Sequence, residues 1–90
     1  MTLSGDDYRR LTRLETVAWS MRSRHEAAAA MLIALESLGN QDSVEALFDK
    51  YWLARNLGRL LIEMGDEDGG TEWLLRSIEY WDRHQRRCLA

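Results

Sequence analysis

The chain has 90 residues and a formal net charge of −3. This length predicts one domain. The acidic charge argues against direct nucleic-acid binding, because phosphate contacts require a basic surface. The chain contains one cysteine, no proline and six glycines, which excludes an internal disulfide and predicts an all-α fold, since helix-breaking residues are almost absent. No apolar run approaches the roughly 18 residues of a membrane-spanning helix, and the N-terminus has no leader-like apolar segment, so we expect a soluble, cytoplasmic protein without a membrane partner.

The first predicted helix runs from about residue 5 to residue 38. Ser4 followed by Asp7 is typical of a helix N-terminus. Side chains spaced alternately three and four residues apart then form an unbroken heptad seam, as in a coiled coil. The seam passes residues 22–26 in phase, so we expect no break there, although Ser23 and Glu26 could cap a separate helix. The seam consists of Leu11, Leu14, Ala18, Met21, His25, Ala28, Leu32 and Leu35.

This seam also bears on self-association. Four heptads and the segment 27–35, which carries no charge on any face, predict a helical bundle formed by a homodimer. The alternative is that the seam packs within the chain.

A second helix is expected from about residue 42 to residue 64. Gly39 suits the left-handed residue that ends a helix, and Asp42 or Ser43 would cap the next one. Two apolar seams lie roughly 120° apart on the helical wheel, which predicts a middle helix with two antiparallel neighbours. One seam is Val44, Leu47, Tyr51, Ala54, Gly58 and Leu61, and the other is Leu53, Leu57, Leu60 and Met64.

A third helix is expected from about residue 71 to residue 88, with Thr71 as its N-cap. The residues before it, 65–70, are rich in acids and glycines and are predicted as a solvated turn. Oxygen ligands do not recur there as a calcium loop requires, and three consecutive acids would repel a phosphate. The predicted inner seam of this helix is Leu74, Ile78, Trp81, Gln85 and Cys88.

One stretch carries a family resemblance. Leu57, Gly58, Leu61, Gly65, Asp66, Gly70, Leu74 and Ser77 fall at the spacings of a tetratricopeptide hairpin. Residues 54–81 therefore resemble a single helical hairpin of that family, which implies binding of a peptide or helix in a groove, as in the small helical chaperones of bacterial secretion systems. The two turns of this chain lie 26 residues apart, instead of the family's roughly 34.

No catalytic residue, metal ligand or cofactor site is predicted. His25 and His84 lack partners at the helical spacings of metal ligands, and Cys88 has no partner within "RRCLA". A long helix followed by two shorter ones is similar in outline to the all-helical chorismate mutases. That family binds its substrate with widely separated Arg residues and a Lys in the long helix, whereas the predicted long helix of this chain contains no Lys.

Aromatic and Arg side chains outside the apolar seams are the predicted partner-binding residues, because these types dominate binding hot spots. We therefore expect a non-catalytic adaptor, chaperone or regulatory antagonist that binds another protein through helix faces, with Trp81 in its core. One alternative function is an acidic mimic of nucleic acid that inhibits a DNA- or RNA-binding protein, and another is a chorismate-mutase-like enzyme. The sequence also allows these rings to be buried as ordinary core residues. The predicted residues are Trp19, Trp52, Arg55, Arg59, Trp73, Tyr80 and His84.

Overall fold

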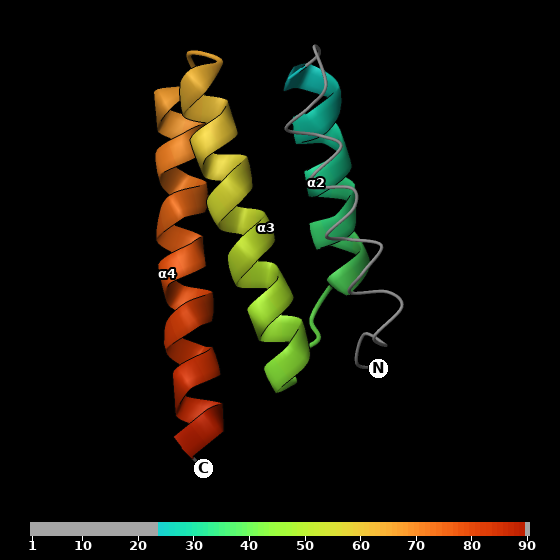
Figure 1. The fold of residues 1–90 in the computed structure, drawn as a ribbon, viewed down its shortest axis with the longest axis vertical. Coiled ribbons are helices and arrows are strands. Elements are labelled where there is room, and N and C mark those ends of the chain that lie inside the picture. Colours follow the sequence, from blue (N-terminus) through green and yellow to red (C-terminus); the bar gives the residue numbers. More distant parts are fainter. Residues whose placement is uncertain (1–23, 90) are drawn as a thin grey trace.

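The computed structural model describes residues 24–89. Within them the chain forms three helices and no strand: α2 (Arg24–Leu38), α3 (Val44–Glu63) and α4 (Glu67–Leu89). Helix α3 lies between the other two, and short connections at opposite ends make neighbouring helices antiparallel (Figure 1). The predicted all-α class and the middle position of the second helix are confirmed. No helix in these residues is long and apolar enough to cross a membrane.

Helix α2 is the described part of the predicted long helix. It ends at Leu38 as expected, and Gly39 follows with a φ of 53°, the left-handed conformation that ends many helices. The predicted start near residue 5, the continuity through Ser23 and the candidate Trp19 lie outside the described residues.

The heptad seam predicted for this helix is not the stripe that α2 buries. His25 and Leu32 are exposed, and of the seam residues in α2 only Leu35 is fully buried. The segment 27–35 is uncharged all round, so the sequence pattern could not distinguish one face from the next, and packing against α3 selected a neighbouring stripe. The buried side chains are Ala27, Met31, Ala34, Leu35 and Leu38.

Helix α3 begins where the sequence predicted. Ser43 is the N-cap residue, and its hydroxyl oxygen accepts a hydrogen bond from the Ala46 N–H at 3.2 Å, which satisfies one of the free donors of the first turn. Both predicted seams of α3 lie on buried or half-buried sides of the helix. Leu53, Leu57 and Leu60 join the core with the buried side of α2, while Gly58 meets the backbone of α4.

The contact between α3 and α4 is closest at two glycines. A Cβ on Gly58 would lie 2.7 Å from the Gly70 carbonyl oxygen, and a Cβ on Gly70 would lie 2.6 Å from the Gly58 carbonyl oxygen. Real Cβ contacts are never this short, so the two backbones can approach in this way only because neither residue has a side chain. This pair of glycines fixes which face of α4 meets α3.

Helix α4 begins at Glu67, four residues before the predicted start. Its N-cap is Asp66 and not Thr71: the Asp66 carboxylate accepts from the Gly69 N–H at 3.0 Å, and the Asp66 carbonyl accepts from the Gly70 N–H at 3.0 Å. Acids in a first turn favour the helix dipole, and Gly70 is helical because it packs on Gly58. The predicted acidic loop is therefore mostly the first turn of α4.

The predicted inner seam of α4 is also partly wrong. Ile78 is 65% exposed and Trp81 40% exposed, whereas Ser77, in the stripe predicted to face a partner, is buried. Gly70 and Leu74 meet Gly58 at the closest contact, and Ser77 is buried, so of the predicted seam Leu74 does face α3, whereas Ile78 and Trp81 were wrongly assigned to the inner face. The stripe of Trp73, Tyr80 and His84 is accordingly half-buried.

Candidate protein-binding surface

Five rings of α3 and α4 form one connected group, here called the ring cluster: Phe48, Tyr51, Trp52, Trp81 and His84. Tyr51 links the two helices, with its ring centroid 5.7 Å from that of Trp52 and 4.8 Å from that of Trp81. Trp81 stacks on His84 at 5.2 Å and 16°. Phe48 closes the group at 5.8 Å from His84 and 6.3 Å from Trp52.

The positions of these rings follow from helix geometry. Residues 48, 51 and 52 are three and four apart and so share one face of α3, as residues 81 and 84 share one face of α4. Because the helices are antiparallel and their faces are fixed at Gly58 and Gly70, the two sets of rings meet.

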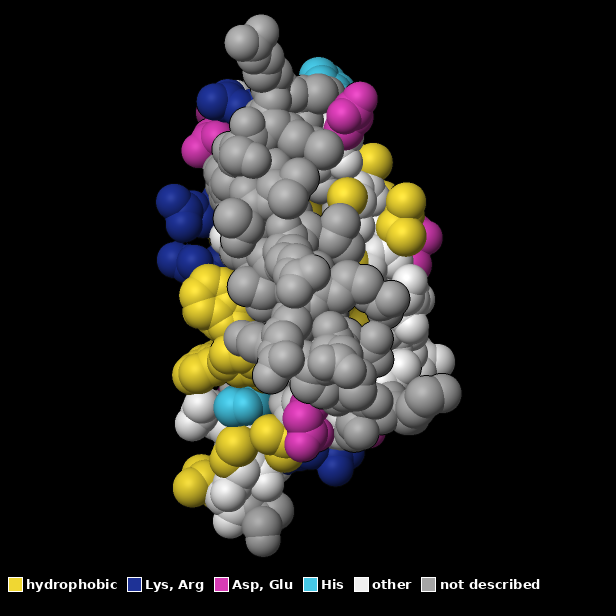
Figure 2. All heavy atoms as spheres, turned by 45° about the vertical axis from the view of Figure 1, so that its right-hand side comes forward, with side chains coloured by type: hydrophobic (Ala, Val, Ile, Leu, Met, Phe, Trp, Pro, Cys, Tyr) yellow, Lys and Arg dark blue, Asp and Glu magenta, His cyan; other side chains and the backbone are white. Residues whose placement is uncertain are grey.

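The ring cluster is only partly withdrawn from water. Trp81 is 40% exposed, and the other four rings are half-buried. The neighbouring turns of α4 extend the apolar surface with Ile78 and Leu75, which are exposed at spacings of three residues. Figure 2 shows hydrophobic side chains and a histidine gathered along the left edge of the molecule, below Lys or Arg side chains. Aromatic surface that stays partly in water is the chemistry of binding hot spots.

Arg55 borders the ring cluster and differs from the other arginines around it. Its guanidinium lies over the Trp52 ring, 5.5 Å from the centroid, and no carboxylate of the described residues pairs with it. By contrast, five other arginines of α2 and α4 each have a carboxylate within 4.0 Å. They are Arg24 with Glu63, Arg76 with Glu72, Arg83 with Glu79, Arg86 with Asp82, and Arg87 with Asp42.

The structure brings together three of the residues predicted from sequence and places Trp73 and Tyr80 elsewhere, while Trp19 lies outside the described residues. Trp52, Arg55 and His84 belong to or border the ring cluster. Trp73 instead packs against the core beneath Arg76, and Tyr80 lies under Lys50.

Arg59 is exposed on α3, one turn from Arg55. Sequence reasoning missed Phe48, Tyr51 and Trp81. The first two could have been found from their spacing to Trp52, whereas Trp81 had been assigned to the core with the wrong seam of α4.

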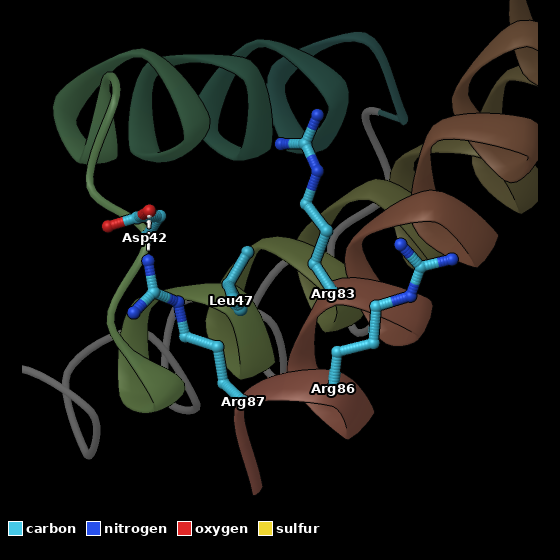
Figure 3. A pocket seen from close by; sticks show the side chains of 5 residues that line it. All are labelled: Asp42, Leu47, Arg83, Arg86 and Arg87. Atoms are coloured by element: carbon cyan, nitrogen blue, oxygen red, sulfur yellow. Dashed lines mark hydrogen bonds and ion pairs between the residues drawn. The ribbon is translucent and has the colours of Figure 1, made fainter. Parts of the chain in front are cut away.

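A second surface feature lies near the C-terminal end of α4. Asp42, Leu47, Arg83, Arg86 and Arg87 line a hollow of about 250 Å³. Figure 3 shows Arg87 reaching from α4 to Asp42 in the α2–α3 connection, while Arg86 points away from Leu47. Each of the three guanidinium groups already pairs with a carboxylate, and cations suit the C-terminal end of a helix. We therefore assign no ligand to this hollow.

Reactive and metal-ligating groups are sparse in the described residues. Residues 24–89 hold no group of three or more His, Cys, Asp or Glu side chains arranged for a metal ion. Cys88 does have a histidine partner, contrary to the sequence prediction: its sulfur lies 3.9 Å from Nε2 and 4.0 Å from Nδ1 of His84, one helical turn away.

Two charged side chains are buried in α3. Asp49 is 4% exposed, and its Oδ2 has no hydrogen-bond partner. Burial, together with nearby Glu45, raises the pKa of Asp49 to about 6. Lys50 donates to the Gln41 carbonyl oxygen and so ties α3 to the α2–α3 connection. Burial and the charge of Arg83 lower the pKa of Lys50.

Comparison with known proteins assigns no activity to this surface. No protein-family model matches the chain, and no curated protein or solved structure matches it significantly. The function therefore has to be argued from the ring cluster and its surroundings.

Proposed function

We propose that this protein is a non-catalytic helical protein that binds another protein through the ring cluster, as an adaptor, chaperone or regulatory antagonist. The observation that carries the proposal is the exposed Trp81, stacked in a connected group of rings and bordered by Arg55, which has no carboxylate partner among residues 24–89. Trp, Tyr and Arg are the residue types most enriched in hot spots, where truncation of one side chain weakens binding by 2 kcal/mol or more.

The rings are also held in place before any partner arrives. Trp81 is fixed between Tyr51 and His84, and Trp52 is in contact with Phe48 and Arg55. Ordering a free aromatic side chain at an interface costs about 0.5–1.5 kcal/mol. Because the ring cluster is already ordered, most of that loss is avoided on binding.

We also propose that residues 54–81 are related to a tetratricopeptide hairpin. The close antiparallel pairing of α3 and α4 at Gly58 and Gly70 is the feature in its favour. In that reading the outer face of the hairpin receives a peptide or helix of the partner. A cytoplasmic setting and a homodimer complete the proposal. The exposed thiol of Cys88 suits a reducing compartment, and Leu32 of the predicted heptad seam is exposed on α2 and offers apolar surface for a second copy.

Mimicry of nucleic acid receives less support from the structure. Glu67 and Asp68 stand in the first turn of α4, where they favour the helix dipole, and two further acids of α4, Glu72 and Glu79, are engaged by arginines. The salt dependence of partner binding distinguishes the two functions. Binding by electrostatic mimicry is screened at high ionic strength, whereas binding through apolar rings persists.

The test compares capture of proteins from the native host by the wild-type chain, Trp81→Ala and the control Ile33→Ala. Ile33 is a large apolar side chain of α2 that is 62% exposed and lies outside the ring cluster. We expect a protein that is retained by the wild type and by Ile33→Ala in about 0.5 M salt and is lost with Trp81→Ala. Equal retention by all three chains would contradict the proposal.

A further inference from the structure

The ring cluster carries a charge preference, and that preference indicates what kind of protein segment fits it. The argument rests on the proposed function above and adds the chemistry of the partner. The Arg55 guanidinium has no carboxylate partner among residues 24–89, while its ring partner Trp52 belongs to the ring cluster.

The Arg55 guanidinium lies over the Trp52 ring, and none of the described residues offers it a carboxylate, so its N–H donors have no anionic acceptor among residues 24–89. A guanidinium carries five N–H donors around its edge, in a geometry that matches both oxygens of a carboxylate. The ring holds the group at 5.5 Å from the centroid. Arg55 is therefore positioned to pair with an incoming carboxylate beside the apolar surface.

Arg76 provides an internal comparison. Its guanidinium also lies over a tryptophan, 4.5 Å from the Trp73 centroid, but it bonds the Glu72 carboxylate at 2.8 Å. The same arrangement of ring and guanidinium thus occurs on α4 as well as on α3. On α4 the carboxylate comes from the chain itself, and at Arg55 that position is unfilled by the described residues.

The apolar part of the surface has the shape of a helix-binding strip. Leu75, Ile78 and Trp81 are exposed at steps of three residues along α4, and six residues of helix span about 9 Å. A bound amphipathic helix presents its apolar side chains at steps of three and four residues, over a similar length. Tyr51 and Trp52 widen the strip on the side of α3.

From these observations we propose that the ring cluster binds an acidic amphipathic helix of the partner protein. The apolar stripe of that helix covers Trp81 and Ile78, and a carboxylate beside the stripe pairs with Arg55. A second copy of this chain and a basic segment are the competing occupants, and the experiment below separates them.

The experiment uses the full chain and three synthetic peptides of about 15 residues, long enough for a helix. The peptides share one apolar stripe, contain no tryptophan, and carry Glu, Gln or Lys beside the stripe. Binding is followed by the change in tryptophan fluorescence of the chain. We expect the Glu peptide to bind roughly ten-fold more tightly than the Lys peptide at about 0.15 M salt.

Variants then test whether Arg55 causes the preference for the Glu peptide over the Lys peptide. Arg55→Gln should reduce it to within about three-fold, and Arg55→Glu should reverse it in favour of the Lys peptide. The matched control is Arg76→Gln, which removes the other guanidinium that lies over a tryptophan and should leave the preference unchanged.

Several outcomes overturn the inference. Equal binding of the Glu and Lys peptides would overturn it, as would a preference for the Glu peptide that survives Arg55→Gln. The lack of saturable binding by any peptide at about 1 mM would also overturn it, because even weak specific complexes form at that concentration. A concentration-dependent fluorescence change without peptide, abolished by Trp81→Ala, would assign the surface to a second copy. Equal binding that is lost with Trp81→Ala would overturn the charge preference alone, whereas peptide binding that ignores Trp81→Ala would also overturn the proposed function.

Discussion

Replacing the buried Asp49 by Asn should stabilise the protein at neutral pH. The folded chain holds this carboxyl group at 4% exposure with Oδ2 unpaired, and its pKa is raised to about 6 from an ordinary 3.8, first by burial and then by Glu45. At 1.36 kcal/mol per pKa unit, this difference corresponds to roughly 3 kcal/mol of unfolding free energy. For a domain of this size, that is a large share of the total stability.

The sign follows from which state binds the proton more tightly. Because the folded-state pKa of Asp49 lies above the unfolded value of 3.8, both states are protonated below about pH 4 and the carboxyl group then carries no penalty. As the pH rises from about 4, the unfolded state ionises first, so stability falls, and the loss is complete above about pH 6–7.

Urea unfolding of the wild type and Asp49→Asn at several pH values measures this effect. The variant should match the wild type within about 0.5 kcal/mol near pH 4 and exceed it by about 2–3 kcal/mol at pH 7. Glu45→Gln is the companion variant: it removes the smaller cause and should shift the pH dependence of the wild type to lower pH. A difference that stays constant with pH, or a variant less stable at pH 7, would show that the Asp49 carboxylate is ionised and satisfied in the folded protein.

Three further predictions concern the helical framework and can be checked by thermal or urea unfolding. Gly58→Ala should destabilise the protein by about 1–3 kcal/mol through the clash with the α4 backbone, although alanine favours a helix, and a stability gain would refute the close approach of α3 and α4. Asp66→Ala should cost about 1 kcal/mol as the loss of an N-cap, and Thr71→Ala nearly nothing; the reverse order would restore the later start of α4. Trp73→Ala should destabilise by about 2–3 kcal/mol, more than Trp81→Ala, because Trp73 packs on the core, and equal losses would mean that the exposed Trp81 is structural.

The helical class and the order of the helices were predictable because they depend on local patterns of the sequence. Absence of proline, the glycine at 39 and the two seams of α3 each indicate an element or a boundary without reference to other parts of the chain. Ser43 was one of two candidate caps, and the hydrogen bond from Ala46 identifies it.

The inner face of α4 was not predictable in the same way. A hydrophobic pattern ranks Ile78 and Trp81 above Gly70 and Ser77, yet the close approach of the two helices depends on the small Gly58 and Gly70. The partner of Gly70 is Gly58, twelve residues earlier, so the choice of face requires knowledge of a tertiary contact. The start of α4 was predicted too late for the same reason: glycines near a helix N-terminus predict a loop when the tertiary contact of Gly70 is not known.

The candidate surface was predictable in part. Trp52 and Arg55 were found because an aromatic residue on a charged helix face stands out within one helix. Trp81 was missed because its exposure follows from the Gly58–Gly70 contact. The link from Tyr51 to Trp81, which turns separate rings into one surface, exists only when both helices are in place.

The central claim is that the face around Trp81 contacts another protein, and photo-crosslinking in the native host tests it most directly. A photoreactive phenylalanine analogue is placed at position 78, next to Trp81, or at position 33 on α2. The two native side chains are matched, with Ile78 65% and Ile33 62% exposed. We predict a discrete adduct with a second protein from position 78 that disappears when Trp81→Ala is added, and no such adduct from position 33. The same adduct from both positions, or an adduct at 78 that persists without Trp81, would contradict the claim.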